Sequence, residues 1–300
     1  MRTEQGFTLI ELMVALVLGL IVIASATMLF LTGLKSNQVQ QGMADLQDNA
    51  NFGLNYITQD VRLANLNTAQ ASLNDALLGG GVVVSPSNLP LAHSDISEAL
   101  ISRSNGDDVG NNNQWTGASN VEQNSDQLVI QYKPVQTGSF DCEGRRINTL
   151  DRMIIQRYFL REDANAGSGE GNPLSLACDA GSYSDTNLAD YGDAGEIIMK
   201  RVDYFRVLLN VSNSSGAHRY ISIHEYMESA GEKPRILGVV LGVLARSSQS
   251  TGQEAATQQN NAFTVLDQNV EIGENGNPNG FIRQVVTQEV ALRNALGERE

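Results

Sequence analysis

LMVALVLGLIVIASATMLFLTGL, residues 12–34, is the stretch that decides the fold of this chain. It contains no charged side chain, and as a helix rising 1.5 Å per residue it would extend over roughly 35 Å. That length matches the hydrocarbon core of a bilayer, which predicts a membrane-spanning helix. A cleaved secretory signal would have a basic start, a shorter apolar stretch and a small-residue cleavage site behind it. We therefore expect the apolar segment to remain in the mature protein.

The same helix is predicted to continue beyond Lys35 with a different character. Apolar residues now recur at spacings of three and four between polar ones: Val39, Met43, Leu46, Ala50, Leu54, Ile57, Val61 and Ala64. Such spacing places them in one stripe along a helix. No proline occurs before Pro86, so nothing forces a break, although three glycines, Gly33, Gly42 and Gly53, weaken the helix locally. We predict one helix from Phe7 to about Leu66.

The rest of the chain has the pattern of strands and loops. Short alternating or β-branched runs predict strands at Gln127–Tyr132, Arg152–Leu160, Ile197–Val211, Arg219–Tyr226, Ile236–Ala245 and Phe281–Leu292, the last of which also fits a helix. Ser102–Asp126 has few apolar residues and is predicted to be a long surface loop, and the polar stretch Ser247–Asn261 is too short for a domain boundary. This order favours an α+β fold with one globular domain, in which the helix stripe packs on a mostly antiparallel sheet.

Composition restricts the class of partner. The 300 residues are 41% hydrophobic, enough for a sizeable core, and carry a formal net charge of -14. Such a surface repels the phosphate backbone of nucleic acids and anionic lipid headgroups, so no direct nucleic-acid partner is expected. Only a cluster of basic residues on one face, drawn from Arg145, Arg146, Arg152 and Arg157, would change that expectation.

Motifs for catalysis or metal binding are missing from the sequence. It has no G-x-S-x-G elbow, H-E-x-x-H helix or P-loop, and His93, His218 and His224 are not spaced like metal ligands. A crowded group of oxygen ligands for calcium, Asn105, Asp107, Asp108 and Asn111, lacks a bidentate glutamate at the right distance. We expect no catalytic residue, no metal and no cofactor, and therefore not an enzyme.

The residues before the apolar segment carry a specific resemblance. Gly6-Phe7-Thr8-Leu9-Ile10-Glu11, followed directly by an apolar span, resembles the class III leader junction of type IV prepilins and type II secretion pseudopilins. The resemblance implies that prepilin peptidase cuts between Gly6 and Phe7 and methylates the new amine of Phe7. It also implies that Glu11, the only charge between Phe7 and Lys35, guides subunit docking by pairing with that amine.

Further motifs narrow the resemblance to the PilW family of minor pilins. They are Asn49-Ala50-Asn51-Phe52, Asp60-Val61-Arg62-Leu63-Ala64, Asp126-Gln127-Leu128-Val129-Ile130, Asp141-Cys142-Glu143-Gly144, Leu176-Ala177-Cys178 and Val290-Ala291-Leu292-Arg293-Asn294. Each is short, but their order covers most of the chain. Asn65 stands where the late-helix signature usually has glycine, which leaves the end of the helix open.

Resemblance to PilW proteins implies the type IV pilin fold and a role in starting pilus assembly, at the pilus tip with other minor pilins. The implied divisions are a leader (1–6), a membrane and filament-core half of the helix (7–34), an amphipathic half (35–66) and a periplasmic globular domain (67–300). The implied partners are prepilin peptidase, other minor pilins, the major pilin, a tip adhesin and, before assembly, the inner membrane. The implied location is a single-pass inner-membrane protein, then the pilus at the cell surface. The alternatives are an adhesive or DNA-capturing tip module, a type II secretion pseudopilin and a membrane-anchored hydrolase; the last lacks a nucleophile and a base.

The two cysteines, Cys142 and Cys178, lie 36 positions apart and outside any C-x-x-C pair. With the globular domain placed outside the cytoplasm, a disulfide between them is the expected state. Closing a loop of this length would stabilise the fold by about 4 kcal/mol in the chain-entropy model.

Overall fold

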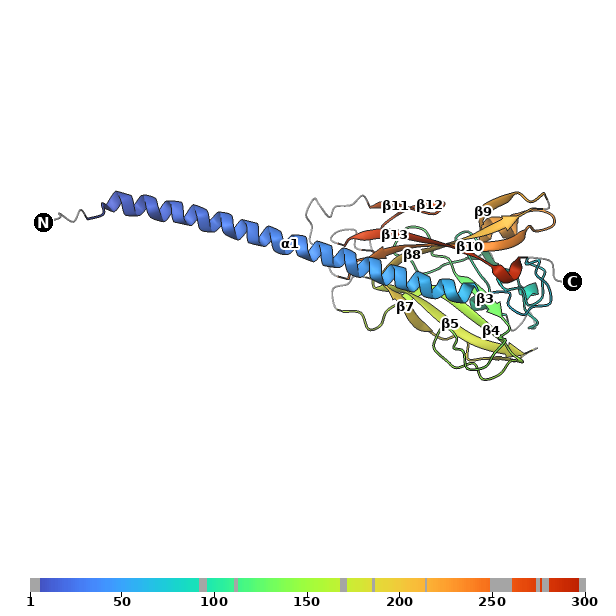
Figure 1. The fold of residues 1–300 in the computed structure, drawn as a ribbon. Helices are drawn as coiled ribbons and strands as arrows, with labels where there is room; N and C mark the ends of the chain where they lie inside the picture. The colour runs from blue at the N-terminus through green and yellow to red at the C-terminus, as the bar shows by residue number, and fades with distance from the viewer. Residues whose placement is uncertain are drawn as a thin grey trace.

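A long helix projects from a globular domain built on two antiparallel sheets (Figure 1). The computed structural model describes residues 6–91, 96–110, 113–167, 172–184, 187–213, 215–248, 261–273, 276 and 281–296. The predicted α+β class, a long N-terminal helix packed on antiparallel strands, is therefore confirmed. Residues 1–5 of the predicted leader and residues 249–260 of the polar stretch lie outside the described residues.

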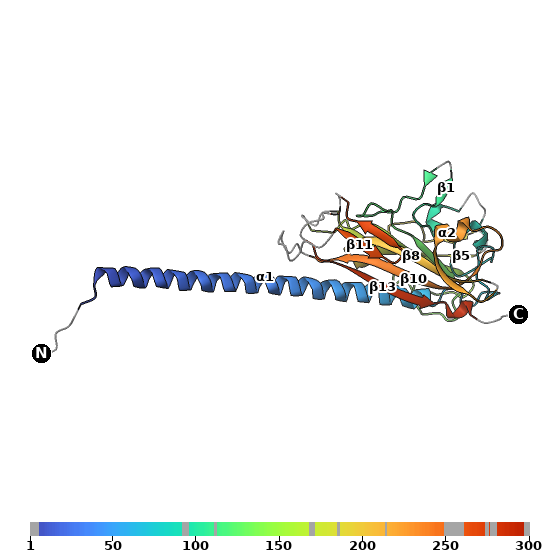
Figure 2. The same cartoon turned by 90° about the horizontal axis from the view of Figure 1, so that it is seen from above.

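Helix α1 comprises Leu9–Val61, 53 residues without interruption, and is thus about 80 Å long. Thr8 caps its first turn, because the Thr8 Oγ1 accepts a hydrogen bond from the Glu11 backbone N–H at 3.3 Å. The helix begins two residues later and ends five residues earlier than predicted. Seen from above, it leaves the globular domain without a bend and carries the N-terminus far from the sheets (Figure 2).

Asn65 ends the helical region. After the C-cap Arg62 the chain continues in turns, and Asn65 adopts a φ of 63°, the left-handed region that glycine and asparagine tolerate best. Its buried amide accepts from the Gly81 N–H at 3.0 Å and donates to the carbonyl oxygens of Gln70 and Asn294, each at 3.1 Å. Asparagine therefore provides the conformation expected of glycine and also links the helix end to the following turn and to the segments at Gly81 and Asn294.

The domain contains two larger sheets, where the sequence predicted one. Sheet I has the order β3-β4-β5-β6, with β7 also pairing with β5, and sheet II has the order β13-β10-β8-β9. The bounds are β3 Leu128–Tyr132, β4 Met153–Glu162, β5 Leu174–Ser184, β6 Asn187–Ala189, β7 Glu196–Lys200, β8 Val202–Ser212, β9 His218–Ser222, β10 Arg235–Arg246 and β13 Arg283–Ala291. Every pairing is antiparallel.

Short elements complete the described chain. Two hairpins pair β1 with β2 and β11 with β12. The bounds are β1 Asp108–Gly110, β2 Asn113–Gln114, β11 Ala262–Val265, β12 Gln268–Glu271, α2 Ile223–Glu228, and the 3-10 turns Pro86–Asn88, Glu98–Leu100 and Arg293–Ala295.

Two predicted segments differ from the observed ones, and a third that fitted both a strand and a helix is a strand. Ile197–Val211 is two strands in two sheets, because Arg201, at a φ of 59°, breaks the run between β7 and β8. Arg219–Tyr226 begins as β9, then becomes helix α2 at Ile223, with Ser222 accepting a capping hydrogen bond from the Glu225 N–H. The ambiguous segment at residues 281–292 is strand β13, held in register along β10.

The predicted surface loop Ser102–Asp126 is partly interior. Asp126 is buried and forms an ion pair with the equally buried Arg206, and it accepts from the Val207 N–H at 2.7 Å. Trp115 donates through Nε1 to the Ser125 carbonyl at 2.9 Å, which anchors the loop. The polar composition of this segment therefore reflects buried hydrogen bonding as well as solvent exposure.

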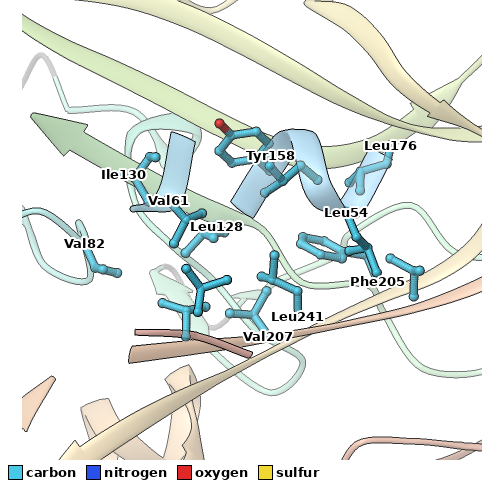
Figure 3. Packing of buried hydrophobic residues seen from close by; sticks show 14 of the residues in the cluster. Leu54, Val61, Val82, Leu128, Ile130, Tyr158, Leu176, Phe205, Val207 and Leu241 are labelled. Carbon is cyan, nitrogen blue, oxygen red and sulfur yellow. The ribbon is translucent and has the colours of Figure 1, made fainter. Parts of the chain in front are cut away.

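Helix α1 packs along the junction of the two sheets. Its second half contacts β7 of sheet I and both β13 and β10 of sheet II. Leu54 and Val61 point into a core that receives Leu128, Ile130, Tyr158 and Leu176 from sheet I and Phe205, Val207 and Leu241 from sheet II (Figure 3). The amphipathic stripe thus fills the gap between two sheets rather than covering the face of one.

Candidate assembly surface

The predicted cleavage junction is accessible. Gly6 and Phe7 precede the first helical residue and have no regular structure; Phe7 is 88% exposed. A Cβ built on Gly6 would have no atom within 4 Å. An enzyme can therefore approach the backbone between these residues in the unassembled chain.

Glu11 lies in the first turn of α1. A carboxylate in this position is favoured by the partial positive charge of the helix N-terminus. Its side chain is exposed, and no ion pair with it is present among the described residues. Phe7 and Glu11 are therefore close in the chain, while the docking role of Glu11 stays a prediction about a neighbouring subunit.

The first half of α1 is a large apolar surface. Every residue from Leu9 to Gln38 is exposed, and Leu9, Val17, Ile23 and Leu29 are among those more than half exposed. This is the one helix in the described part of the chain that is long and apolar enough to cross a membrane. Monomeric proteins do not leave patches of this size in water, so a bilayer or other apolar helices must cover it.

The second half of α1 is fixed in the globular domain. Its buried residues are Gly42, Leu46, Ala50, Gly53, Leu54, Ile57, Thr58 and Val61. Met43, which the sequence placed in the stripe, is 43% exposed, and two glycines that were expected only to weaken the helix are buried. A Cβ on Gly53 would lie 2.6 Å from Met199 Cε and 2.8 Å from Met199 Cβ. The glycines therefore let the helix approach the sheets closely.

The structure joins Cys142 and Cys178 in a disulfide, as predicted, with a Cα–Cα distance of 6.2 Å. Both cysteines belong to the main core, where Cys142 follows the loop after β3 and Cys178 is on β5. Tyr56 on α1 donates to the Cys142 carbonyl at 3.1 Å. The disulfide therefore holds a loop of sheet I against the packed half of the helix, about 70 Å from the cleavage junction.

Asp60 was noted in the sequence only as part of a family signature. Its carboxylate accepts a hydrogen bond from the Tyr158 hydroxyl at 2.9 Å. Burial raises the pKa of Asp60 to about 6, the Tyr158 hydrogen bond opposes the increase, and the nearby Asp141 adds to it. Arg62 from the same signature is exposed and forms no ion pair with any described residue. The acid of the signature thus joins helix to sheet, and the arginine faces outward.

Two of three carboxylates that come close together are paired with arginines. Glu143, Asp179 and Asp193 have oxygens within 4.8 Å of one another. Arg145 forms an ion pair with Glu143, and Arg157 forms one with Asp179. The third carboxylate, Asp193, forms no ion pair with a described residue.

In the oxygen-rich loop that the sequence suggested for calcium, the Asp107 carboxylate is already hydrogen-bonded within the protein. Asp107 accepts from the Ser104 N–H and lies 3.2 Å from His224 Nδ1. Asn111 and His93 lie outside the described residues.

Two of the four arginines considered for DNA capture are paired with acids. Arg145 is paired with Asp141 and Glu143, and Arg157 with Asp179. Arg157 also lies over the Phe159 ring, 3.8 Å from its centroid. These acids offset part of the positive charge that a groove for a phosphate backbone requires.

Two family models match the chain. The prokaryotic N-terminal methylation motif matches residues 1–27, and the model described as type IV pilus-assembly protein W matches residues 157–294. The chain is a PilW-family type IV pilin. The first match covers the junction and the exposed start of α1; the second runs from β4 to the last 3-10 turn.

Comparison with solved structures found a remote match, and comparison with curated proteins found none. A type IV-like pilin from Thermus thermophilus resembles the structure with a TM-score of 0.42 and 12% sequence identity, over 83% of this chain and 96% of that one. No curated protein matches the sequence.

Membership of the PilW family gives the coarse function. The chain is a minor pilin, and pilins are structural rather than enzymatic proteins. Its pilin nature implies processing by prepilin peptidase and interaction with other pilins. The N-terminal motif and the apolar helix indicate membrane anchoring and association with the pilus.

Proposed function

We propose that this PilW-family pilin takes part in starting type IV pilus assembly, at the pilus tip together with other minor pilins. The observation that carries the proposal is the division of α1: an exposed apolar half follows a cleavable junction, and the other half is locked between two sheets. Such a helix can leave the bilayer only if other apolar helices replace the lipid around it. The description of the matched family as a pilus-assembly protein supports a role at the start of that process.

The proposed sequence of events begins in the inner membrane. The chain spans it once with the globular domain in the periplasm, until prepilin peptidase cuts between Gly6 and Phe7 and methylates the Phe7 amine. The new positive amine then pairs with Glu11, on the same chain or on a neighbour. A carboxylate in hydrocarbon is unfavourable by up to about 3 kcal/mol, and pairing offsets the desolvation of both charges. The pair also sets the axial offset between adjacent subunits.

The test of docking is Glu11→Val in a strain that lacks the native copy. We expect a variant that is cleaved and inserted normally but is at least tenfold depleted from filaments and from complexes with other minor pilins. Immunoblots of sheared pili and co-purification from detergent measure this at matched expression. Asp48→Val, an exposed acid of the packed half, is the control. Normal assembly by the Glu11→Val subunit would refute the docking role.

Processing has its own test. Replacing Gly6 by leucine should leave an uncut precursor in the membrane, because a bulky side chain blocks approach to the backbone. An intact mass of the mature wild-type protein that begins at Met1 would refute cleavage at this junction.

The start of assembly is tested by deletion of the chain. Surface pili should fall at least tenfold and return when the wild-type copy is supplied. An undiminished number of pili in the deletion strain would refute the initiating role. It would not affect the conclusions about cleavage and docking, which have their own tests.

A further inference from the structure

A pocket of about 190 Å³ opens beside sheet I, between the loop that precedes β4 and a wall formed by Gly181 and Ser182 of β5 and by Asp190, which follows β6. Its floor includes Ile147 and Ile154, each 6% exposed, which pack with Leu63 and Leu66 just beyond the end of α1. The pocket is therefore beside the C-terminal end of α1, the end of the helix opposite Leu9. Hydrogen-bond donors line it: Arg145, Arg146, Arg152, Asn148, Thr149 and Ser182.

Arg152 is held in this wall by neutral oxygens alone. It donates to Ser182 Oγ at 2.9 Å, to the Ser182 carbonyl at 2.7 Å, to Ser184 Oγ at 3.3 Å and to the Asn187 carbonyl at 3.0 Å. Within the described chain no carboxylate pairs with it. Four of its five N–H groups are thus engaged, and its positive charge is not directly paired with a carboxylate.

Arg145 has carboxylate partners, whereas Arg146, like Arg152, has none among the described residues. Arg145 is taken up by Asp141 and Glu143 and by the carbonyl oxygens of Ala180 and Asp190. Arg146 is exposed, and its guanidinium forms no ion pair or hydrogen bond with a described residue. The pocket therefore offers one free guanidinium fork next to a second, fixed positive charge, in a chain whose net charge is -14.

We propose that this pocket binds a carboxylate of a partner protein subunit, from an aspartate or glutamate side chain or from a chain terminus. Arg146 supplies the two parallel N–H groups that fit a carboxylate, and Arg152 supplies charge and its remaining N–H. The hydroxyl and amide groups of Ser182 and Asn148 can complete the oxygen's hydrogen bonds. The proposal rests on the proposed function, because the partner is a neighbouring subunit of the pilus complex.

The size and charge of the pocket favour a single carboxylate over a nucleic acid. Two acids, Asp141 and Asp190, line the same opening. They leave room for one anionic group but repel a chain of phosphates. The overall negative charge of the protein acts in the same direction.

Contact with the end of α1 gives the pocket a defined place in the assembly. A subunit that inserts a carboxylate here lies on the side away from the membrane. The apolar start of α1 then remains available for the subunit that follows. The molecule would thus use apolar contacts at one end and a charge pair at the other.

The test uses the full-length chain in detergent and the variant Arg146→Gln, with Arg62→Gln as control. Arg62 is also exposed and without an ion pair, but does not line the pocket. Replacing Arg146 removes no hydrogen bond or ion pair with a described residue, so thermal unfolding should change little. Loss of a charge-assisted hydrogen-bonded pair corresponds to about a tenfold or greater change in affinity. We expect a tenfold loss of co-purification with the other minor pilins for Arg146→Gln, and less than twofold for Arg62→Gln.

Small probes identify the carboxylate. N-acetylglutamate α-amide represents a side chain, N-acetylglycine a chain terminus, and N-acetylglycinamide is the neutral control. Each is titrated at millimolar concentration while the arginine side-chain NMR signals are followed. We expect shifts with one of the two acids that disappear in Arg146→Gln and weaken in Arg146→Lys, which keeps the charge but loses the fork.

Four results would overturn the proposal. The first is equal shifts with the neutral probe, and the second is a tenfold loss of co-purification in both Arg146→Gln and Arg62→Gln. The third is binding of a single-stranded oligonucleotide that depends on Arg146, and the fourth is normal co-purification by Arg146→Gln. In each case the Glu11→Val and deletion results would still decide the proposed function independently.

Discussion

The two halves of α1 share one continuous backbone but have opposite surroundings. From Leu9 to Gln38 no side chain is buried, whereas eight residues between Gly42 and Val61 are. The helical backbone is favoured by the absence of proline, which both halves share, and by the cap on the first turn. Side-chain composition decides what each half packs against. The first half requires lipid or other helices, and the second half requires the two sheets.

Glycines and acidic residues also have different surroundings in the two halves of α1. Cβ atoms on Gly19 and Gly33 would have no neighbour within 4 Å, whereas one on Gly53 would collide with Met199. Glu11 is exposed near the helix start, whereas Asp60 near the end is hydrogen-bonded to Tyr158 and has a raised pKa. The same residue type therefore has a different role in each half.

Truncation should show the largest difference between the halves. Deleting residues 1–34 should leave a soluble, folded domain, because that segment contributes nothing to the globular core. Deleting beyond Ile57 should cause aggregation, because the core between the two sheets then meets water. Size-exclusion chromatography and circular dichroism of the two fragments measure this. Equal solubility of both fragments would contradict the packing of the second half.

Removing the disulfide tests the globular domain that receives the helix. Cys142→Ser with Cys178→Ser should lower the free energy of unfolding by up to about 4 kcal/mol, and should make the loop between the cysteines sensitive to proteases. Denaturant titration of the full-length chain in detergent gives the difference. Thiol labelling of unreduced, denatured wild-type protein provides the check: two reactive thiols would mean that the bond is not formed.

Asp60 should make the packed half sensitive to pH. Its pKa is about 6 in the folded chain and 3.8 ordinarily, so the folded state holds the proton more tightly. The stabilisation is complete below about pH 4 and is lost as the pH rises through 6, by up to about 3 kcal/mol. Asp60→Asn should therefore match the wild type near pH 4 and be more stable at pH 7.

Denaturant titrations at both pH values measure the Asp60 effect, with the exposed Asp48→Asn as control. An Asp60→Asn chain that is less stable than the wild type at pH 7 would show that the carboxylate contributes more through Tyr158 than burial removes.

Much of the helix and its packing could be predicted from residue order. The uncharged segment, the stripe and the cysteine pair each depend on local sequence or on a simple count, and each agrees with the structure. The number of sheets could not be predicted, because a strand pattern does not specify which strand is its partner. The break at Arg201 depends on a single φ of 59° that the sequence does not mark.

The buried elements that the sequence did not predict consist of small and polar residues, which are not typical of a core. Strand β5, LSLACDAGSYS, is buried along nearly its whole length, yet its small and polar residues show neither alternation nor a β-branched run. Asp126 reads as a loop residue but is neutralised by Arg206 from β8. The pocket with Arg146 and Arg152 likewise depends on contacts with β5 and β6 that are distant in sequence.

Gly53→Leu and Gly33→Leu compare the halves with one substitution in the same helix. At position 53 the new side chain meets Met199; the methionine's Cε can rotate away, but its Cβ, 2.8 Å from the new Cβ, is fixed by the β7 backbone. Helix and sheet must then separate, which overpacking data place at about 1 to 3 kcal/mol, partly offset by the better helix propensity of leucine. At position 33 there is no neighbour within 4 Å, so only the propensity gain remains. Denaturant titration of both variants in detergent should give a clear loss for Gly53→Leu and none for Gly33→Leu. Equal stability of the two would mean that α1 does not approach β7 this closely, and that its second half is held by the stripe alone.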